Sequence, residues 1–101
     1  MAIQKPRMID TLNVNEGVGG TRCDASKYEV VRTALLKAVP ESDEGIPSKD
    51  LPMAVKAQLP TGEIPGGGNI SWYTTVVKLD LEARGLIERI PDSKPQRVRK
   101  L

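Results

Sequence analysis

The chain has 101 residues, a formal net charge of +2 and 39% hydrophobic residues, which fits one compact domain with a single core. It contains no histidine and only one cysteine, so the usual nitrogen ligands for zinc and any internal disulfide are excluded. We therefore expect no metal, no cofactor and a reducing, cytoplasmic location. Phenylalanine is absent, so the core must be built mainly from aliphatic residues.

The N-terminal part, residues 1–23, is predicted to be an arm, and residues 24–101 are predicted to form the main domain. The first residues contain no apolar run, so we expect neither a signal peptide nor a membrane span. Three apolar residues hint at a short strand, which the glycine-rich run 15–20 breaks: Ile9, Leu12 and Val14. The arm could cover its own domain, pair with a second chain, or reach a nucleic acid through Lys5 and Arg7.

A first helix is predicted to begin with Asp24 or Ser26 as its cap, to run to about Ala38 and to stop at Pro40. Ser26 also begins a capping-box pattern, because a glutamate follows three residues later. Four residues recur at helical spacing on its inner side: Tyr28, Val31, Leu35 and Ala38. An acidic turn follows, and Ile46 could then form a short strand.

A second helix is predicted from Ser48, its expected cap, through Leu59. Its inner side is expected to carry four apolar residues: Leu51, Ala54, Val55 and Leu59. An eleven-residue connection, 60–70, follows, whereas the turn of a DNA-reading helix-turn-helix is about three or four residues. Its glycines lack the lysine and hydroxyl ending of a phosphate-binding loop, so we interpret it as a flexible connection in which Asn69 or Ser71 caps the next helix.

The segment from Ser71 to Arg84 contains no proline or glycine and is predicted to be a third, largely buried helix that ends at Gly85. A helical wheel gathers its polar side chains in one arc: Ser71, Thr74, Thr75, Lys78 and Glu82. The wheel places a wide set of apolar residues on the other side: Trp72, Tyr73, Val76, Val77, Leu79, Leu81 and Ala83. An apolar arc of this width indicates burial rather than a single contact stripe.

The last eighteen residues, 84–101, are predicted to form a basic β-hairpin. A short apolar strand, 86–90, is followed by a turn at 91–95 that is rich in proline, aspartate and serine, and 97–101 returns as the partner strand. Residues 84–101 carry six basic and two acidic groups. This charge suits contact with nucleic acid phosphates, but basic residues also protect exposed strand edges from unwanted pairing.

The stretch from Leu81 to Arg89 resembles the junction between the recognition helix and the wing of winged helix-turn-helix domains. The resemblance implies that Leu81 enters the core and that Leu86 and Ile87 start the wing. Over Tyr28–Lys100 the chain also resembles a small family of uncharacterised single-domain bacterial proteins with this fold. The resemblance implies a mainly helical α+β fold, namely a three-helix winged helix-turn-helix with a C-terminal β-hairpin wing. It implies no activity.

Two functional hypotheses follow, and neither is enzymatic. In the first, the chain binds double-stranded DNA, for example as a transcriptional regulator, with the third helix in the major groove and the wing on the backbone. The predicted contacts comprise four helix residues and five basic residues of the hairpin: Ser71, Thr74, Thr75 and Lys78, with Arg89, Lys94, Arg97, Arg99 and Lys100. In the second, the third helix or the arm binds protein, as a homodimer or to a partner.

Two residues invite a catalytic interpretation, and both have a simpler explanation. Cys23 is interpreted as a small buried apolar residue, because the chain has no histidine to activate a thiol. Asp80 falls inside the apolar arc of the third helix, four residues before Arg84, so a helix ion pair is favoured over a catalytic acid. We therefore expect no enzymatic activity.

Overall fold

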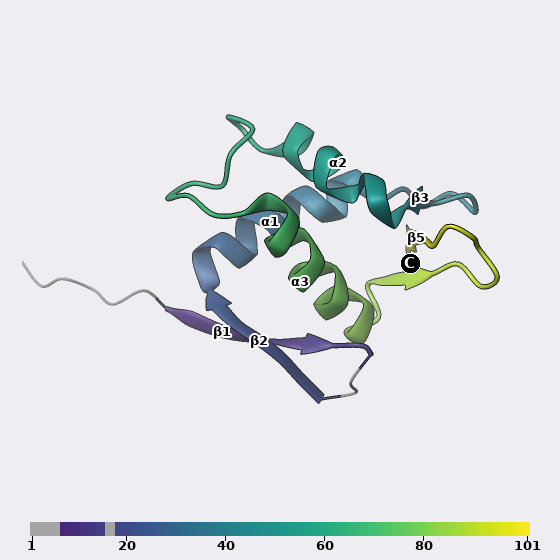
Figure 1. Cartoon of the computed structure of the whole chain (residues 1–101), viewed down its shortest axis with the longest axis horizontal. Coiled ribbons are helices and arrows are strands. Elements are labelled where there is room, and N and C mark those ends of the chain that lie inside the picture. Colours follow the sequence, from purple (N-terminus) through teal and green to yellow (C-terminus); the bar gives the residue numbers. More distant parts are fainter. Residues whose placement is uncertain (1–6, 16–17) are drawn as a thin grey trace, which may run out of the picture.

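A computed structural model describes residues 7–15 and 18–101, and in this part of the chain three helices pack with two small antiparallel sheets into a small α+β unit (Figure 1). The α+β class predicted from the sequence is thus confirmed. The elements run in this order: β1 Met8–Asn13, β2 Val18–Asp24, α1 Ala25–Ala38, β3 Ile46–Pro47, α2 Leu51–Gln58, α3 Ile70–Ala83, β4 Ile87–Arg89 and β5 Arg97–Lys100.

The strands β1 and β2 form an N-terminal hairpin, whereas the sequence predicted only one short strand that the glycine-rich run 15–20 would end. The strand β2 already starts at Val18 and pairs antiparallel with β1, with an irregular register between Asp10 and Leu12. Glycine is needed at this irregularity, because a Cβ on Gly20 would lie 2.9 Å from the carbonyl oxygen of Leu12. Gly19 and Gly20 therefore belong to the strand rather than ending it.

The helix α1 matches the predicted segment and resolves the choice of cap. The carboxylate of Asp24 accepts hydrogen bonds from the amides of Ser26, at 2.8 Å, and Lys27, at 3.1 Å. The helix then ends at Ala38, ahead of Pro40, as predicted. Tyr28, Val31 and Leu35 are buried as predicted, whereas Ala38 is only partly buried.

The second predicted helix is correct in place, but its start is wrong. Residues Ser48–Asp50 form a 3₁₀ turn, and the α-helix begins only at Leu51. The Ser48 side chain does not cap the helix, because its hydroxyl donates to the side-chain oxygen of Gln96 at 3.0 Å. Leu51, Val55 and Leu59 are buried as predicted.

The helix α3 starts at Ile70 and is capped by Asn69, whose side-chain oxygen accepts a hydrogen bond from the Trp72 amide at 2.9 Å. At its other end Gly85 takes the predicted left-handed conformation, with φ of 75°. The amide of Leu86 then donates to the carbonyl of Leu81 at 3.0 Å, which closes the helix end. The connection between α2 and α3 is long, as predicted.

The second sheet has the strand order β3-β5-β4, so the last strand lies in the middle. Val98 of β5 faces Ile46 of β3 on one side and Arg89 of β4 on the other. The short strand predicted at Ile46 and the pairing of the two C-terminal strands are therefore confirmed.

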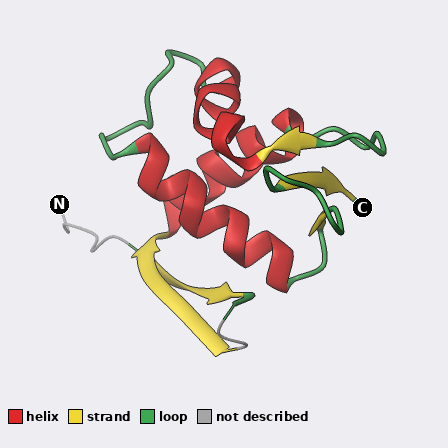
Figure 2. Cartoon of the chain, turned by 45° about the vertical axis from the view of Figure 1, so that its right-hand side comes forward, coloured by secondary structure: helices red, strands yellow, loops and turns green. Residues whose placement is uncertain are grey.

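The core lies between the three helices and is closed by one sheet at each side. Ten of its residues are almost fully buried: Val31, Leu35, Val39, Leu51, Val55, Ile64, Val77, Leu81, Ile87 and Val98. The N-terminal hairpin packs mainly against α3 and adds Cys23 to the same cluster (Figure 2). The sequence left three roles open for the N-terminal arm. The described part of the arm packs on its own domain, which is the first of those roles.

Candidate interaction surface on the third helix

Two of the four helix residues predicted to contact DNA are buried rather than exposed. Thr74 is 2% exposed and Lys78 is 8% exposed, whereas Ser71 and Thr75 face solvent. The helical wheel did not predict this burial of Thr74 and Lys78. The helix α3 packs on several sides, against α1, α2 and the N-terminal hairpin. The contacts of a helix packed on several sides can include polar positions.

The charged side chains of α3 are turned inward, and each pairs with a group of opposite charge. The ammonium of Lys78 and the guanidinium of Arg89 both pair with the carboxylate of Glu82. The side chains of Lys78 and Glu82 are only 10% and 3% exposed. This cluster joins α3 to β4, so two of the nine predicted DNA contacts are engaged inside the molecule.

The remaining basic residues predicted to contact phosphates also have protein partners, with one exception. Arg99 donates to the carboxylates of Glu88, at 2.6 Å, and Asp43, at 2.9 Å. Two others donate to main-chain oxygens: Arg97 to Glu44 at 3.2 Å, and Lys100 to Leu36 at 2.9 Å. Lys94 is exposed near the tip of the hairpin. Lys5 of the arm lies outside the described residues, and Arg7 is exposed.

What α3 does present to solvent is uncharged. We define the outer stripe as four residues of the helix that are exposed or partly exposed: Trp72, Thr75, Leu79 and Ala83. Trp72 is 44% exposed, Thr75 and Ala83 are also exposed, and Leu79 is partly exposed. In Figure 1, α3 runs in front of α1, on the face of the molecule toward the viewer.

Trp72 and Ala83 are exposed, which corrects the prediction that they face the buried side, and Leu79, predicted on the same side, is only partly buried. The neighbouring Tyr73 enters the core instead and is 8% exposed. The two rings contact edge to face, with centroids 4.8 Å apart. Trp72 is therefore a large exposed aromatic side chain that contacts the buried Tyr73.

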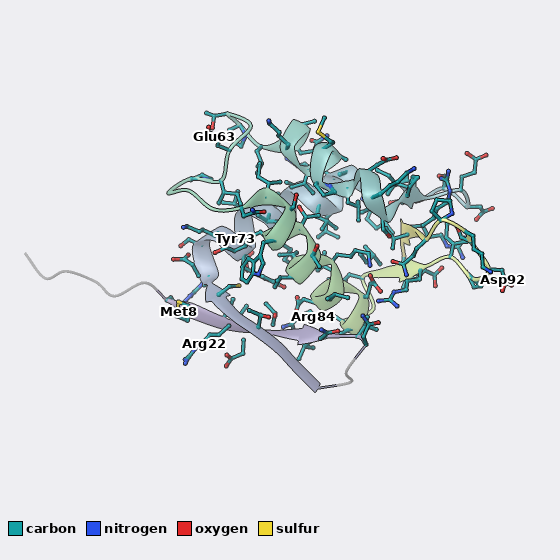
Figure 3. The ribbon with its side chains drawn as sticks, in the orientation of Figure 1. Met8, Arg22, Glu63, Tyr73, Arg84 and Asp92 are labelled. Atoms are coloured by element: carbon teal, nitrogen blue, oxygen red, sulfur yellow. The ribbon has the colours of Figure 1, made fainter. Side chains whose placement is uncertain are left out.

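A second buried cluster holds the N-terminal hairpin to α3. Asp80 is 0% exposed, and its carboxylate accepts hydrogen bonds from the Leu12 amide, at 2.8 Å, the Arg84 guanidinium, at 2.9 Å, and the Tyr28 hydroxyl. Figure 3 shows Arg84 at the C-terminal end of α3, beside the hairpin. The ion pair predicted between Asp80 and Arg84 is confirmed, and it is one part of a larger network.

The Asp80 cluster has an electrostatic signature at Tyr28. Burial, and then the hydrogen bond to Asp80, raise the pKa of Tyr28 to about 12. All donors around Asp80 are used in holding β1, α1 and α3 together. The arrangement is structural, and it leaves the carboxylate no open side from which to act on a substrate.

The surface of the described residues includes two hollows of similar size. One, of about 330 Å³, runs between α1 and the end of α2 and includes Val30, Ala34 and Leu59. The other, of about 380 Å³, lies beside the glycines of the α2–α3 connection and includes Lys56 and Glu63.

Within residues 7–15 and 18–101, no group of three or more acidic or cysteine side chains is arranged to hold a metal ion. None of the helices that the structure describes is long and apolar enough to cross a membrane.

The chain belongs to a family of unknown function, DUF6958, whose model matches residues 8–98. The match begins at the first residue of β1 and ends within β5, so it includes both sheets and all three described helices. No curated protein and no solved structure matches the chain. Membership of this family therefore assigns no activity to the chain.

Proposed function

We propose that this chain is a non-enzymatic protein-binding module on a winged-helix framework, and that the outer stripe of α3 is its docking surface. The observation that carries the proposal is the contrast on α3 between an exposed uncharged stripe and inward-turned charges. Trp72 and Ala83 are exposed at the two ends of the stripe, while the side chains of Lys78 and Glu82 pair beneath the surface.

The order of the elements supports the winged-helix framework. From α1 onward the chain runs α1, β3, α2, α3, β4, β5, with β5 central in the sheet. The pair of β4 and β5 follows the third helix, which is where the proposed framework would have its wing. This is the order that the resemblance of Leu81–Arg89 to a helix–wing junction implies. The long α2–α3 connection departs from a DNA-reading helix-turn-helix, whose turn is about three or four residues.

The chemistry of the outer stripe suits a protein partner. Exposed tryptophan is enriched among the residues that dominate binding energy in protein interfaces, because it buries a large area with few rotatable bonds. Charged residues are depleted at the centre of such interfaces, and the outer stripe contains none. The edge-to-face contact with Tyr73 restricts the Trp72 ring, so less side-chain conformational entropy is lost when a partner covers it.

DNA binding, with a role in transcription, is the second candidate, and the winged-helix order of elements is what favours it. The helix side chains left to read bases are Ser71 and Thr75, without the arginine, asparagine or glutamine that makes bidentate base contacts. Most of the basic hairpin residues would first have to leave their present carboxylate or carbonyl partners. Lys94 alone, among the hairpin contacts predicted from the sequence, is exposed without such a partner among the described residues.

The docking surface can be tested by affinity capture with matched variants. Leu79→Glu places a charge at the centre of the outer stripe, and we expect it to abolish capture of any partner that the wild-type chain retains. Met53→Glu is the control, because Met53 lies on α2, outside the stripe, and is 75% exposed. Both variants should keep the wild-type circular dichroism spectrum. Partners captured equally by wild type and Leu79→Glu would show that the stripe is not the docking surface.

A further inference from the structure

One of the two surface hollows is a groove that follows α1 for about two turns. It has a volume of about 330 Å³ and lies between α1 and the end of α2, and its α1 wall runs from Glu29 to Lys37. These two residues are eight positions apart, so at about 1.5 Å per residue the wall is about 12 Å long. We call this hollow the α1–α2 groove. It is formed by other elements than the outer stripe, which belongs to α3.

The middle of the α1–α2 groove is apolar and is held in place by the core. Ala34 and Leu59 are 3% and 5% exposed and belong to the core cluster, and Val30 is partly buried against it. Binding sites are usually preformed hollows of about 300 to 1,000 Å³ with mainly apolar walls and a few polar groups. The groove lies at the small end of this range, so it suits a small apolar group such as one side chain of a partner.

The two ends of the α1 wall carry opposite charges. Glu29 and Lys37 are both exposed, and neither forms an ion pair within residues 7–15 and 18–101. The charges of α3 differ in this respect, because each of them has a partner of opposite sign. The Glu29 end of the groove therefore favours a cation and the Lys37 end favours an anion, with an apolar group between them.

The walls of the groove also carry two uncharged polar side chains. Thr33 on α1 and Gln58 at the end of α2 are both exposed and line the hollow. A hydroxyl and an amide can each donate and accept hydrogen bonds. A peptide in extended form has free backbone amide and carbonyl groups to bond with them, whereas an α-helix uses these groups internally. The walls therefore favour an extended peptide over a helical one.

From this arrangement we infer that the α1–α2 groove binds an extended peptide segment of a partner protein, with a basic, an apolar and an acidic residue at alternate positions. Alternate side chains of an extended chain point to the same side, and each residue advances by about 3.3 Å. Four steps therefore cover about 13 Å, which matches the roughly 12 Å between the two charges of the groove. The apolar side chain in the middle lies on Ala34 and Leu59. This site is independent of the outer stripe.

An NMR titration of ¹⁵N-labelled full-length chain tests the site. The probe is a five-residue peptide with lysine first, leucine third, glutamate fifth and serine between, and with blocked termini that add no charge. We expect saturable shifts of the amides of Val30, Thr33, Ala34 and Leu59, and none along the outer stripe. Replacement of the leucine by serine should abolish the shifts. Peptides with two lysines or two glutamates should bind about two- to five-fold more weakly, as expected for exposed ion pairs.

Charge reversal in the groove provides the matched variants. Glu29→Lys makes both ends basic, so this variant should prefer the peptide with two glutamates. Lys37→Glu makes both ends acidic, so it should prefer the peptide with two lysines. Lys94→Glu is the control, because Lys94 is exposed near the tip of the C-terminal hairpin and does not line the groove. It should keep the wild-type order of preference.

Four results would overturn the inference. They are the absence of saturable shifts, shifts that lie outside the groove, equal binding of the three charged peptides, and an order of preference that neither charge reversal changes. Tighter binding of a helical peptide with the same three side chains at its first, fifth and ninth positions would also overturn it, because the extended form is part of the inference.

Discussion

Asp80→Ala is expected to lower the free energy of unfolding by about 2 to 6 kcal/mol. The change leaves two buried donors, the Leu12 amide and the Tyr28 hydroxyl, without an acceptor, and each costs about 1 to 3 kcal/mol. Arg84 contributes less to this loss, since its side chain is 40% exposed and can be solvated by water. Chemical denaturation measures the change. The matched control is Asp10→Ala, because Asp10 is 80% exposed and only faces Arg22 at 3.6 Å, so its loss should change stability by less than about 1 kcal/mol.

The same variant has a local signature at Tyr28. Removal of the Asp80 carboxylate eliminates the hydrogen bond and the charge that help raise the pKa of Tyr28 to about 12, while burial remains. The pKa of Tyr28 should therefore fall but stay above its ordinary value of 10. A group whose pKa is raised on folding stabilises the protein below its unfolded pKa, so wild-type stability should fall as pH rises from 10 through 12. This alkaline loss should be smaller in Asp80→Ala, and an equal loss in both proteins would contradict the role given to Asp80.

Leu81→Ala is the second large effect. Leu81 is 0% exposed at the point where α3 meets the rest of the core, so the lost burial and the cavity should destabilise the domain by about 2 to 5 kcal/mol. That is a large share of the roughly 5 to 15 kcal/mol available to a domain, and the melting temperature should drop sharply or the chain should fail to fold.

Two further variants make the Leu81 prediction decisive. Leu81→Val removes less volume and should lower stability by about 0.5 to 1.5 kcal/mol, so it gives a measurable value even if the alanine variant does not fold. Met53→Ala removes a side chain that is 75% exposed and should change stability by less than about 0.5 kcal/mol. A melting temperature unaffected by Leu81→Ala would refute the packing of α3 described above.

The helices could be predicted from the sequence because their signals are local. Asp24 and Asn69 provide caps, Pro40 and Gly85 end two of the helices, and the apolar spacing of α1 identifies its buried side. These signals depend on residues within a few positions of each other. The C-terminal strands were predictable for the same reason, since a turn-forming run separates them.

The surface of α3 could not be predicted from its own periodicity. A wheel sorts residues by polarity, but Lys78 and Asp80 are buried because their partners neutralise them, and the Leu12 amide that binds Asp80 is 68 positions away in the sequence. The wheel placed Trp72 on the buried side because it is hydrophobic, but of the two neighbouring aromatic residues only Tyr73 is buried. The start of β2 was missed because glycines usually interrupt strands, whereas Gly20 permits a close approach between β1 and β2.

The central claim is that the outer stripe, and not the basic hairpin, is the functional surface. Fluorescence anisotropy of a mixed-sequence DNA duplex, titrated with the chain at two salt concentrations, tests it most directly. We expect no saturable binding at either concentration, and the same result for an Arg97→Ala, Arg99→Ala double variant. Saturable binding that weakens with salt and is reduced by the double variant would contradict the claim, because phosphate contacts release counterions and depend on those charges.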